Sequence, residues 1–408
     1  MITITTAESA LKNIYLESVI HEINTKTNPF LTMIGDRTKT IAEKDAKAYV
    51  RYGNEGSVAA GEEDGILPTN KDTKTAEIIV PLKNLYGSFQ ITDKAIKAAQ
   101  NNPGAFTSLI GGEMKNLVDT AQNNLNRMVY GNGNPYLAYT SHWSANAFYM
   151  PARFSSNFSI GTRFLVFNSN NQKVCDNVLT VEDMQFDPAD SSRFGIVFTG
   201  GSVVDTRFDR YYIYPEFSTS VEMNGIDSIF LPDSMYNLNK SEYQEILPFI
   251  DDAMKVIDNV RPVQTVLDEE RLLEFFDGLE EHTMGRPSDI IMTHPTIRKS
   301  LFESLKNNRS NIDVAEFEGG FRGFTFNGVP LYADIRCLAG TVYALDTNGF
   351  AMQQLVDWTW LEGEDGSILK PVSGKPVFSA TLVKYADLVC EKPFLQGKLT
   401  GFSALKWR

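Results

Sequence analysis

Cysteine and histidine are scarce in this sequence of 408 residues, which contains three cysteines and four histidines. Cys175, Cys337 and Cys390 are odd in number and far apart, which excludes a disulfide framework and a paired metal-ligand spacing. The histidines are His21, His142, His282 and His294, and no two of them have the spacing of a metal site. We therefore expect a reducing compartment, no metal and no cofactor.

Long apolar runs and an excess of basic residues are also missing. No stretch of 18 apolar residues occurs, so we expect no membrane span. The first residues lack the features of a signal peptide, so we expect the protein to stay in the cytoplasm where it is made. The 51 acidic residues exceed the 38 basic ones, giving a net charge of −13, which disfavours a surface built to neutralise nucleic-acid phosphates.

The composition is otherwise that of a globular protein, with 42% hydrophobic and 11% aromatic residues. A chain of this length predicts two or three compact units. Residues 7–23 carry apolar side chains at helical spacing, Tyr15 among them, and predict a short amphipathic helix. Residues 25–36 contain helix-breaking Asn-Pro and Gly and little core of their own, so we expect an arm that docks on another body.

Two strand-like segments, residues 46–52 and 75–92, enclose a long polar excursion. Residues 53–74 are rich in Gly, Glu, Asp, Asn and Thr, with almost no large apolar residue except Ile66 and Leu67. A loop of this length is uncommon in a compact domain unless it has a function. We interpret it as a projecting two-stranded loop.

The strongest periodic signal comes next in the chain. A short helix is expected over residues 93–100, and Asn102-Pro103 then offers an N-cap and a first-turn proline for another helix. Apolar residues spaced three and four apart from Phe106 onward predict a helix that ends at Tyr130 and is roughly 37 Å long. Leu117 lies on its apolar stripe.

The remainder of the chain has a mixed character, so the fold class expected is α+β. Residues 136–220 hold short β-like runs joined by Asn, Gly, Asp and Ser clusters, and predict a small inserted β-barrel. Helices are predicted over residues 267–282 and 295–306. Strands are predicted over residues 289–293, 329–333, 341–345, 351–361 and 377–389. Asp365-Gly366 suits a hairpin turn between the last two of them.

Each group of residues that suggests chemistry has a plainer explanation. His294 precedes Pro295 at a strand-to-helix junction, where a cap or turn role is the better interpretation. The acidic clusters at Glu62, Glu63 and Asp64 and at Glu362, Glu364 and Asp365 lack the rhythm of a calcium loop and are interpreted as exposed acidic turns.

No motif in the sequence specifies an active site. Residues 319–323 are glycine-rich but lack the Gly-Lys-Ser/Thr ending of a phosphate loop, and neither a Gly-x-Ser-x-Gly elbow nor a cysteine nucleophile signature occurs. We therefore predict that the chain is not an enzyme. A loose arm, a projecting loop and a long helix instead favour self-association, because elements without a core of their own must be buried on neighbours.

Several segments, in a fixed order, carry a resemblance to a known family. The first runs from Ala76 to Ala99, "AEIIVPLKNLYGSFQITDKAIKAA", and leads into the long helix that ends at Tyr130-Gly131-Asn132-Gly133. The others are "EMNGI" from Glu222, "EGGFRGFTFNGVPLYAD" from Glu318, "VYALDT" from Val342, "DWTWLEGEDGSILK" from Asp357 and "KYADLVC" from Lys384. Together they cover most of the chain, which resembles the tailed-bacteriophage major capsid proteins of the Hong Kong 97 type fold.

The resemblance implies a division of the chain into parts. These are an N-terminal arm over residues 1–44, an extended loop over 45–92, a peripheral domain with the spine helix over 93–134, a β-rich insertion over 135–220, an axial domain over 221–350, and a return to the peripheral domain over 351–408. The extended loop is expected to lie over a neighbouring subunit. Some relatives crosslink a loop lysine to an asparagine of a neighbour, but Lys71 and Lys74 have no identified partner, so no such crosslink is predicted.

The function implied is a shell protein that forms hexamers and pentamers of an icosahedral head around double-stranded DNA, without sequence-specific binding and without a membrane. A separate scaffolding protein, a portal and a decoration protein are the other partners expected, and the location is the virion, assembled in a bacterial cytoplasm. Contacts between subunits are expected at Tyr15, Phe30, Glu62, Glu63, Asp64, Ile66, Leu67, Lys71 and Lys74. The alternatives are an encapsulin-like nanocompartment shell and, from another class, a soluble hydrolase that uses Glu62 or His294.

Overall fold

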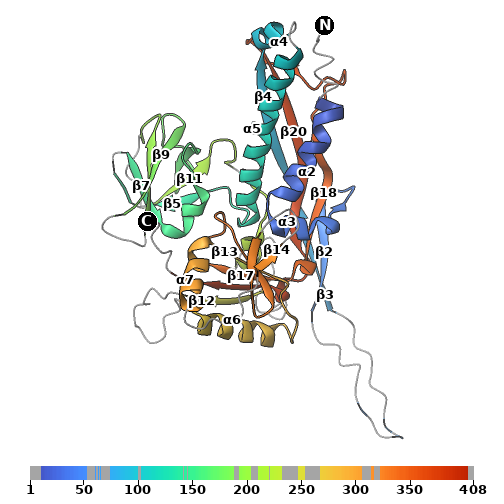
Figure 1. Ribbon diagram of the computed structural model, residues 1–408, viewed down its shortest axis with the longest axis vertical. Coiled ribbons are helices and arrows are strands. Elements are labelled where there is room, and N and C mark those ends of the chain that lie inside the picture. The colour runs from blue at the N-terminus through green and yellow to red at the C-terminus, as the bar shows by residue number, and fades with distance from the viewer. Residues whose placement is uncertain are drawn as a thin grey trace.

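A computed structural model describes most of the chain. The described residues are 11–52, 60, 63, 65, 74–99, 103–140, 142–144, 146–187, 193–203, 210–219, 221–231, 247–252, 267–305, 314–316 and 322–402. Within them, long strands and a long helix run side by side, a β-rich module lies to one side, and a mixed α and β domain lies below (Figure 1).

The long strands form the peripheral sheet. β18 (Phe350–Trp360) and β20 (Val377–Cys390) are antiparallel neighbours, and β4 (Lys83–Thr92) pairs with the other edge of β20. Two short strands complete the sheet: β1 (Lys39–Thr40), parallel to β18, and β19 (Lys370–Pro371), antiparallel to β20. Residues 93–349 separate β4 from β18, the next strand of this sheet along the chain, so the chain leaves the sheet and returns to it.

The spine helix α5 (Pro103–Val129) runs along these strands (Figure 1). It begins at Pro103, the first-turn proline that the sequence indicated, because proline has the fixed φ that suits a first helical position. α4 (Asp93–Ala99) precedes it as predicted. Leu117 is 7% exposed and packs on β4, where a Cβ added to Gly87 would lie 3.0 Å from Leu117 Cδ1. Gly87 therefore allows the helix and the strand to approach closely.

The N-terminal segment departs from the sequence-based expectation. It forms a π-helical turn, η1 (Leu11–Tyr15), followed by α2 (Leu16–Lys26), α3 (Pro29–Met33) and the 3-10 turn η2 (Gly35–Arg37). Leu11, Ile23 and Phe30 are fully buried in the same core as the peripheral sheet. The expectation that residues 25–36 have little core is therefore wrong, because their apolar side chains fill the layer beside α5 and β18.

A two-stranded ribbon extends from the peripheral domain. β2 (Asp45–Tyr52) and β3 (Lys74–Pro81) are antiparallel, with Asp45 opposite Pro81 and Tyr52 opposite Lys74. The predicted two-stranded base of the extended loop is therefore present (Figure 1). Most of residues 53–73, which would form its tip, lie outside the described part of the chain.

The inserted module is a seven-stranded antiparallel sheet with its own core, centred on Phe148, Phe164 and Ile196. Its strands are β5 (Ala138–Thr140), β6 (His142–Ser144), β7 (Ala147–Pro151), β8 (Arg163–Asn168), β9 (Leu179–Phe186), β10 (Arg193–Thr199) and β11 (Tyr211–Pro215), and η3 (Ala152–Asn157) follows β7. The strand order runs from β5 at one edge to β6 at the other. Its closure into a barrel stays a prediction.

A second seven-stranded sheet has the order β12-β21-β17-β13-β16-β15-β14 and is called the axial domain together with its helices. Six of its strands come from residues 221–350, the range predicted for that domain, whereas β21 comes from the segment predicted to return to the peripheral domain. Its strands are β12 (Phe249–Asp252), β13 (Ile290–Thr293), β14 (Val314–Glu316), β15 (Arg322–Phe326), β16 (Val329–Ala333), β17 (Val342–Leu345) and β21 (Gly397–Thr400). Its other elements are α6 (Glu269–His282), α7 (Pro295–Leu305), η4 (Ile226–Phe230), η6 (Thr347–Gly349) and η7 (Pro393–Leu395). A third hydrophobic core lies between this sheet and the two helices.

The connection from β18 to β20 differs from the predicted simple hairpin. Asp365-Gly366 does form a turn, with Gly366 at φ +76°, but it leads into β19 rather than into β20. The turn that enters β20 carries Gly374 at φ +74°, a left-handed conformation that glycine adopts without strain. The acidic turn at residues 362–366 is thus a separate projection from the sheet.

Candidate assembly surfaces

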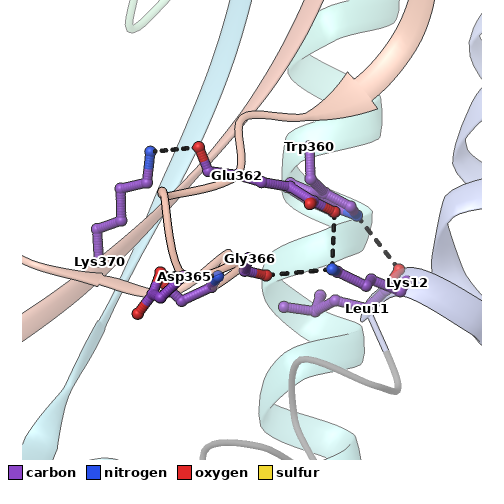
Figure 2. Close-up of polar contacts among 8 residues, drawn as sticks. Leu11, Lys12, Trp360, Glu362, Asp365, Gly366 and Lys370 are labelled. Atoms are coloured by element: carbon purple, nitrogen blue, oxygen red, sulfur yellow. Dashed lines mark hydrogen bonds and ion pairs between the residues drawn. The ribbon is translucent and has the colours of Figure 1, made fainter.

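The acidic turn after β18 holds the start of the N-terminal segment. Lys12 Nζ lies 2.7 Å from Glu362 Oε1 and donates to the carbonyl oxygen of Gly366 at 3.1 Å (Figure 2). Trp360 Nε1 donates to the carbonyl oxygen of Leu11 at 3.2 Å. The interpretation of Glu362 as part of a purely solvated turn is therefore incomplete, because this carboxylate pairs with the arm.

A buried polar junction joins the arm, the spine helix and the axial domain. Asn28 Nδ2 donates to Asn126 Oδ1 at 2.8 Å and to Tyr130 Oη at 3.0 Å, and Asn126 Nδ2 donates to Asp334 Oδ2 at 3.0 Å. Asn28 Oδ1 also accepts from the backbone N–H of Phe30 and thereby caps α3. Burial raises the pKa of Asp334 above its usual range. This junction was not predicted from the sequence, because its members lie far apart in the chain.

The outer face of the ribbon carries two exposed large apolar side chains. Ala46, Ala48 and Val50 are buried on one face of β2, whereas Tyr49 is 64% exposed on the other. On β3, Ile79 is 52% exposed and lies on the outer face next to Tyr49's strand. Tyr49 and Ile79 thus expose apolar area on the same face of two adjacent strands.

Sequence reasoning overlooked these two residues because it concentrated on the polar loop beyond them. The alternation of Lys47, Tyr49 and Arg51 with small or apolar residues is the signal that could have revealed the outer face. Tyr49 Oη donates to Glu77 Oε1 at 3.1 Å across the two strands. This cross-strand contact orients the tyrosine on the ribbon.

The predicted contact residues fall into three groups. Tyr15 is half-buried against the main core, and Phe30 is fully buried, with its ring edge-on to Phe350 at a centroid distance of 5.0 Å. Glu63 is exposed, and Lys74 is the first residue of β3. Glu62, Asp64, Ile66, Leu67 and Lys71 lie outside the described residues. Phe30 thus stabilises its own subunit, and its side chain is not accessible to a second one.

A buried ion pair connects the spine helix to the start of the axial domain. Arg127 Nη1 donates to Glu222 Oε2 at 2.8 Å and Nη2 donates to Oε1 at 2.5 Å. The side chain of Arg127 is 9% exposed and that of Glu222 is 4% exposed. Because water is largely excluded from both, each charge is stabilised mainly by the other.

Replacing Glu222 by Ala should therefore lower the free energy of unfolding by about 3 kcal/mol, because Arg127 would remain buried without a counter-charge. Chemical denaturation of the purified protein measures this change. The control is Lys97→Ala, which removes the exposed pair between Lys97 and Asp93 at 2.7 Å and should cost less than about 1 kcal/mol. Equal, small losses in both variants would contradict a stabilising role for the buried pair.

His294 caps a helix, as the sequence predicted. It immediately precedes α7, and its carbonyl oxygen accepts from the backbone N–H of Ile297 at 3.0 Å. The backbone N–H of Thr296 donates to His294 Nδ1 at 3.3 Å. Burial lowers the pKa of His294 to about 4. A histidine that stays neutral and caps a helix has a structural role.

This pKa predicts a pH dependence of stability. The folded pKa lies below the unfolded value of 6.5, so protonation favours the unfolded chain, and stability is lost as the pH falls from 6.5 towards 4. Between pH 7 and pH 4 the wild type should lose about 3 kcal/mol more than His294→Asn, which keeps a capping side chain but cannot titrate. Denaturation curves at several pH values measure the difference, and parallel curves would contradict the assignment.

The described residues hold no group of three His, Cys, Asp or Glu side chains that could bind a metal ion. Cys175, Cys337 and Cys390, all among the described residues, are buried and form no disulfide. Among the described helices, none combines the length and the apolar character needed to cross a bilayer.

Comparison with known proteins gives similarity at the level of the fold. No family model and no curated protein matches the sequence. A chain of the cyanophage A-1(L) capsid asymmetric unit is 11% identical with a TM-score of 0.54, over 96% of this chain and 95% of that one. A chain of the holo-SrpI encapsulin complex from Synechococcus elongatus PCC 7942 is 9% identical with a TM-score of 0.44, over 91% of this chain and 87% of that one. A chain of the satellite phage P4 procapsid is 11% identical with a TM-score of 0.43, over 95% of this chain and 99% of that one. The chain thus has the α+β fold of a phage capsid protein, as the sequence resemblance implied.

Proposed function

We propose that this chain is a major capsid protein that self-assembles into hexamers and pentamers of an icosahedral phage head. The observation that carries the proposal is the shared fold with the cyanophage A-1(L) capsid chain over nearly the whole length of both chains. The likeness covers 96% of this chain and 95% of that one, which supports a shared architecture over nearly the whole length.

The ribbon and the loop beyond it are the proposed contact with a neighbouring subunit. Tyr49 and Ile79 supply exposed apolar area on the ribbon, and Glu63 belongs to the loop. Lys71 and Lys74 add two basic residues to the same segment of the sequence. Apolar area with interspersed charges is the composition expected of a surface that is buried on assembly.

The proposed content of the shell is double-stranded DNA, which the acidic chain would enclose without reading its sequence. A chain with a net charge of −13 has little capacity to neutralise phosphates, which agrees with a container that lets its content move. A scaffolding protein, a portal and a decoration protein are the other proposed partners, and the virion is the proposed location.

The experiment that tests this function compares what the purified particles enclose. Particles from cells that also express the neighbouring structural genes should sediment as shells and show an absorbance ratio dominated by nucleic acid, which nuclease does not remove. Shells that contain a single co-purifying enzyme instead of DNA would favour the nanocompartment alternative. A small oligomer with hydrolytic activity would contradict both the phage-head proposal and the nanocompartment alternative.

A further inference from the structure

Three tyrosines and two arginines gather on the outer face of the inserted module. Tyr139 of β5 and Tyr212 of β11 lie opposite each other in the sheet and are half-buried, whereas the residues on either side of each in the chain are buried. The ring centroid of Tyr136 lies 5.6 Å from that of Tyr212 and 6.4 Å from that of Tyr139. The guanidinium carbon of Arg210 lies 5.0 Å from the centroid of the Tyr139 ring, and Arg153 Nη2 donates to Tyr139 Oη at 2.6 Å. These five residues are called the tyrosine–arginine face.

The positive charges of this face are not balanced within the described part of the chain. Arg153 and Arg210 are exposed, and neither forms an ion pair with a carboxylate of the described residues. Arg163 of the same module differs from them, because its guanidinium lies 3.0 Å from Glu216 Oε1. Tyrosine and arginine are also among the residues that contribute most to binding at protein interfaces. The face is therefore suited to an acidic protein segment.

A segment of the opposite charge belongs to the extended loop. Between Arg51 and Lys71 the sequence contains four acidic residues and no basic one, and three of the acids are consecutive, Glu62, Glu63 and Asp64. Glu63 is exposed. A chain of about ten residues can span up to about 35 Å, so residues in the middle of this loop are able to reach another copy of the chain. Charge and reach together make the loop a suitable partner for a positive surface.

The inserted module and the ribbon are arranged as the subunits of a ring require. The module lies on one side of the spine helix α5, and the ribbon of β2 and β3 lies on the other side (Figure 1). Subunits of a closed ring with more than two members contact each other through two different surfaces, so each copy must carry both members of a matching pair. A positive face on one side and an acidic loop that begins on the other side form such a pair.

We propose that the tyrosine–arginine face of one copy binds Glu62, Glu63 and Asp64 of its neighbour in the same ring. This inference rests on the proposed function, because it requires hexamers and pentamers. The carboxylates of the loop pair with the guanidiniums of Arg153 and Arg210. The tyrosine rings beside the guanidiniums shield these pairs from water, which strengthens the attraction between the charges. The inserted module thereby contributes to assembly as the binding site for its neighbour's loop.

Exchanging the charges of the two surfaces tests the proposal. The face variant carries Arg153→Glu and Arg210→Glu, and the loop variant carries Glu62→Lys, Glu63→Lys and Asp64→Lys. Each variant by itself should lower the fraction of protein that sediments as shells by about tenfold or more, because like charges then face each other at every contact. The variant with all five changes has opposite charges again and should regain most of the wild-type fraction.

The matched control carries Glu182→Arg and Asp183→Arg, which also reverse two exposed charges of the inserted module. These residues lie on β9, which β8 separates from β11 in the sheet. The control should assemble as the wild type does. A second measurement uses the pair Arg210→Cys and Glu63→Cys. Because the three natural cysteines are buried, oxidation of assembled protein should link neighbouring copies through the new pair and give a ladder of oligomers on a non-reducing gel.

The possible failures of this inference and of the proposed function are distinguishable. If the wild type forms neither shells nor rings, the proposed function is wrong and this inference fails with it. If wild-type shells form but the variant with all five changes assembles no better than the face variant, the two surfaces do not bind each other. Loss of assembly in the face variant alone, with a normal loop variant, would show that another acidic partner occupies the face. Only monomers on the non-reducing gel of the cysteine pair would likewise overturn the inference.

Discussion

Replacing Leu117 by Asp should prevent the protein from folding. Leu117 is 7% exposed at the centre of α5 and packs on Gly87 of β4, where the helix and the strand approach closely. An aspartate here would place a carboxyl group in the main hydrophobic core without a counter-charge. The cost exceeds about 5 kcal/mol, which is comparable to the whole free energy of unfolding of a typical domain. The variant should accumulate as insoluble protein, which a solubility assay and circular dichroism measure.

The matched control is Asn116→Asp, which adds the same charge to the adjacent, exposed position of α5. It should remain soluble and change the free energy of unfolding by less than about 0.5 kcal/mol. Soluble, native-like protein carrying Leu117→Asp would contradict the assignment of α5 as the buried spine of the peripheral domain.

Deleting residues 56–71 should leave a folded subunit that fails to assemble. The deletion retains β2, β3 and five connecting residues, a length that suits a hairpin loop. If the loop supplies more than about 1.4 kcal/mol of each subunit contact, its loss weakens association by more than tenfold per contact, and a shell multiplies this effect over many contacts. Sedimentation should then show capsomers or monomers in place of shells.

The control for this deletion replaces residues 56–71 by a Gly/Ser linker of equal length, which keeps the reach of the loop but removes its side chains. Both variants should retain the wild-type circular dichroism spectrum. Normal shells from the deletion variant would contradict the proposed role of the loop, whereas shells from the linker variant alone would show that its length matters more than its side chains.

The sequence predicted the elements that have a strong local pattern. The apolar repeat placed α5 to within a few residues of its ends, and the predicted strand over residues 329–333 coincides with β16. One face of each segment packs against a hydrophobic core. Apolar residues therefore recur in the sequence at the spacing of that buried face. The expectation for His294 was also correct, because a polar residue before a helix-initiating proline is a local signal.

Prediction from the sequence failed where the structure depends on contacts between residues that are distant in the chain. Asn28, Asn126 and Asp334 form one junction although hundreds of residues separate the first from the last. The pairing of Lys12 with Glu362 is equally remote, so the acidic turn was interpreted as solvated. A single sequence carries no record of such pairs, because each member by itself is an ordinary polar residue on a helix or in a turn.

Electron microscopy of negatively stained, purified protein tests the central claim of self-assembly most directly. The protein should be expressed by itself and together with its neighbouring structural genes. The fold and the exposed ribbon predict closed shells, capsomer rings or tubes built from this chain. A uniform monomer or dimer under both conditions would contradict the claim.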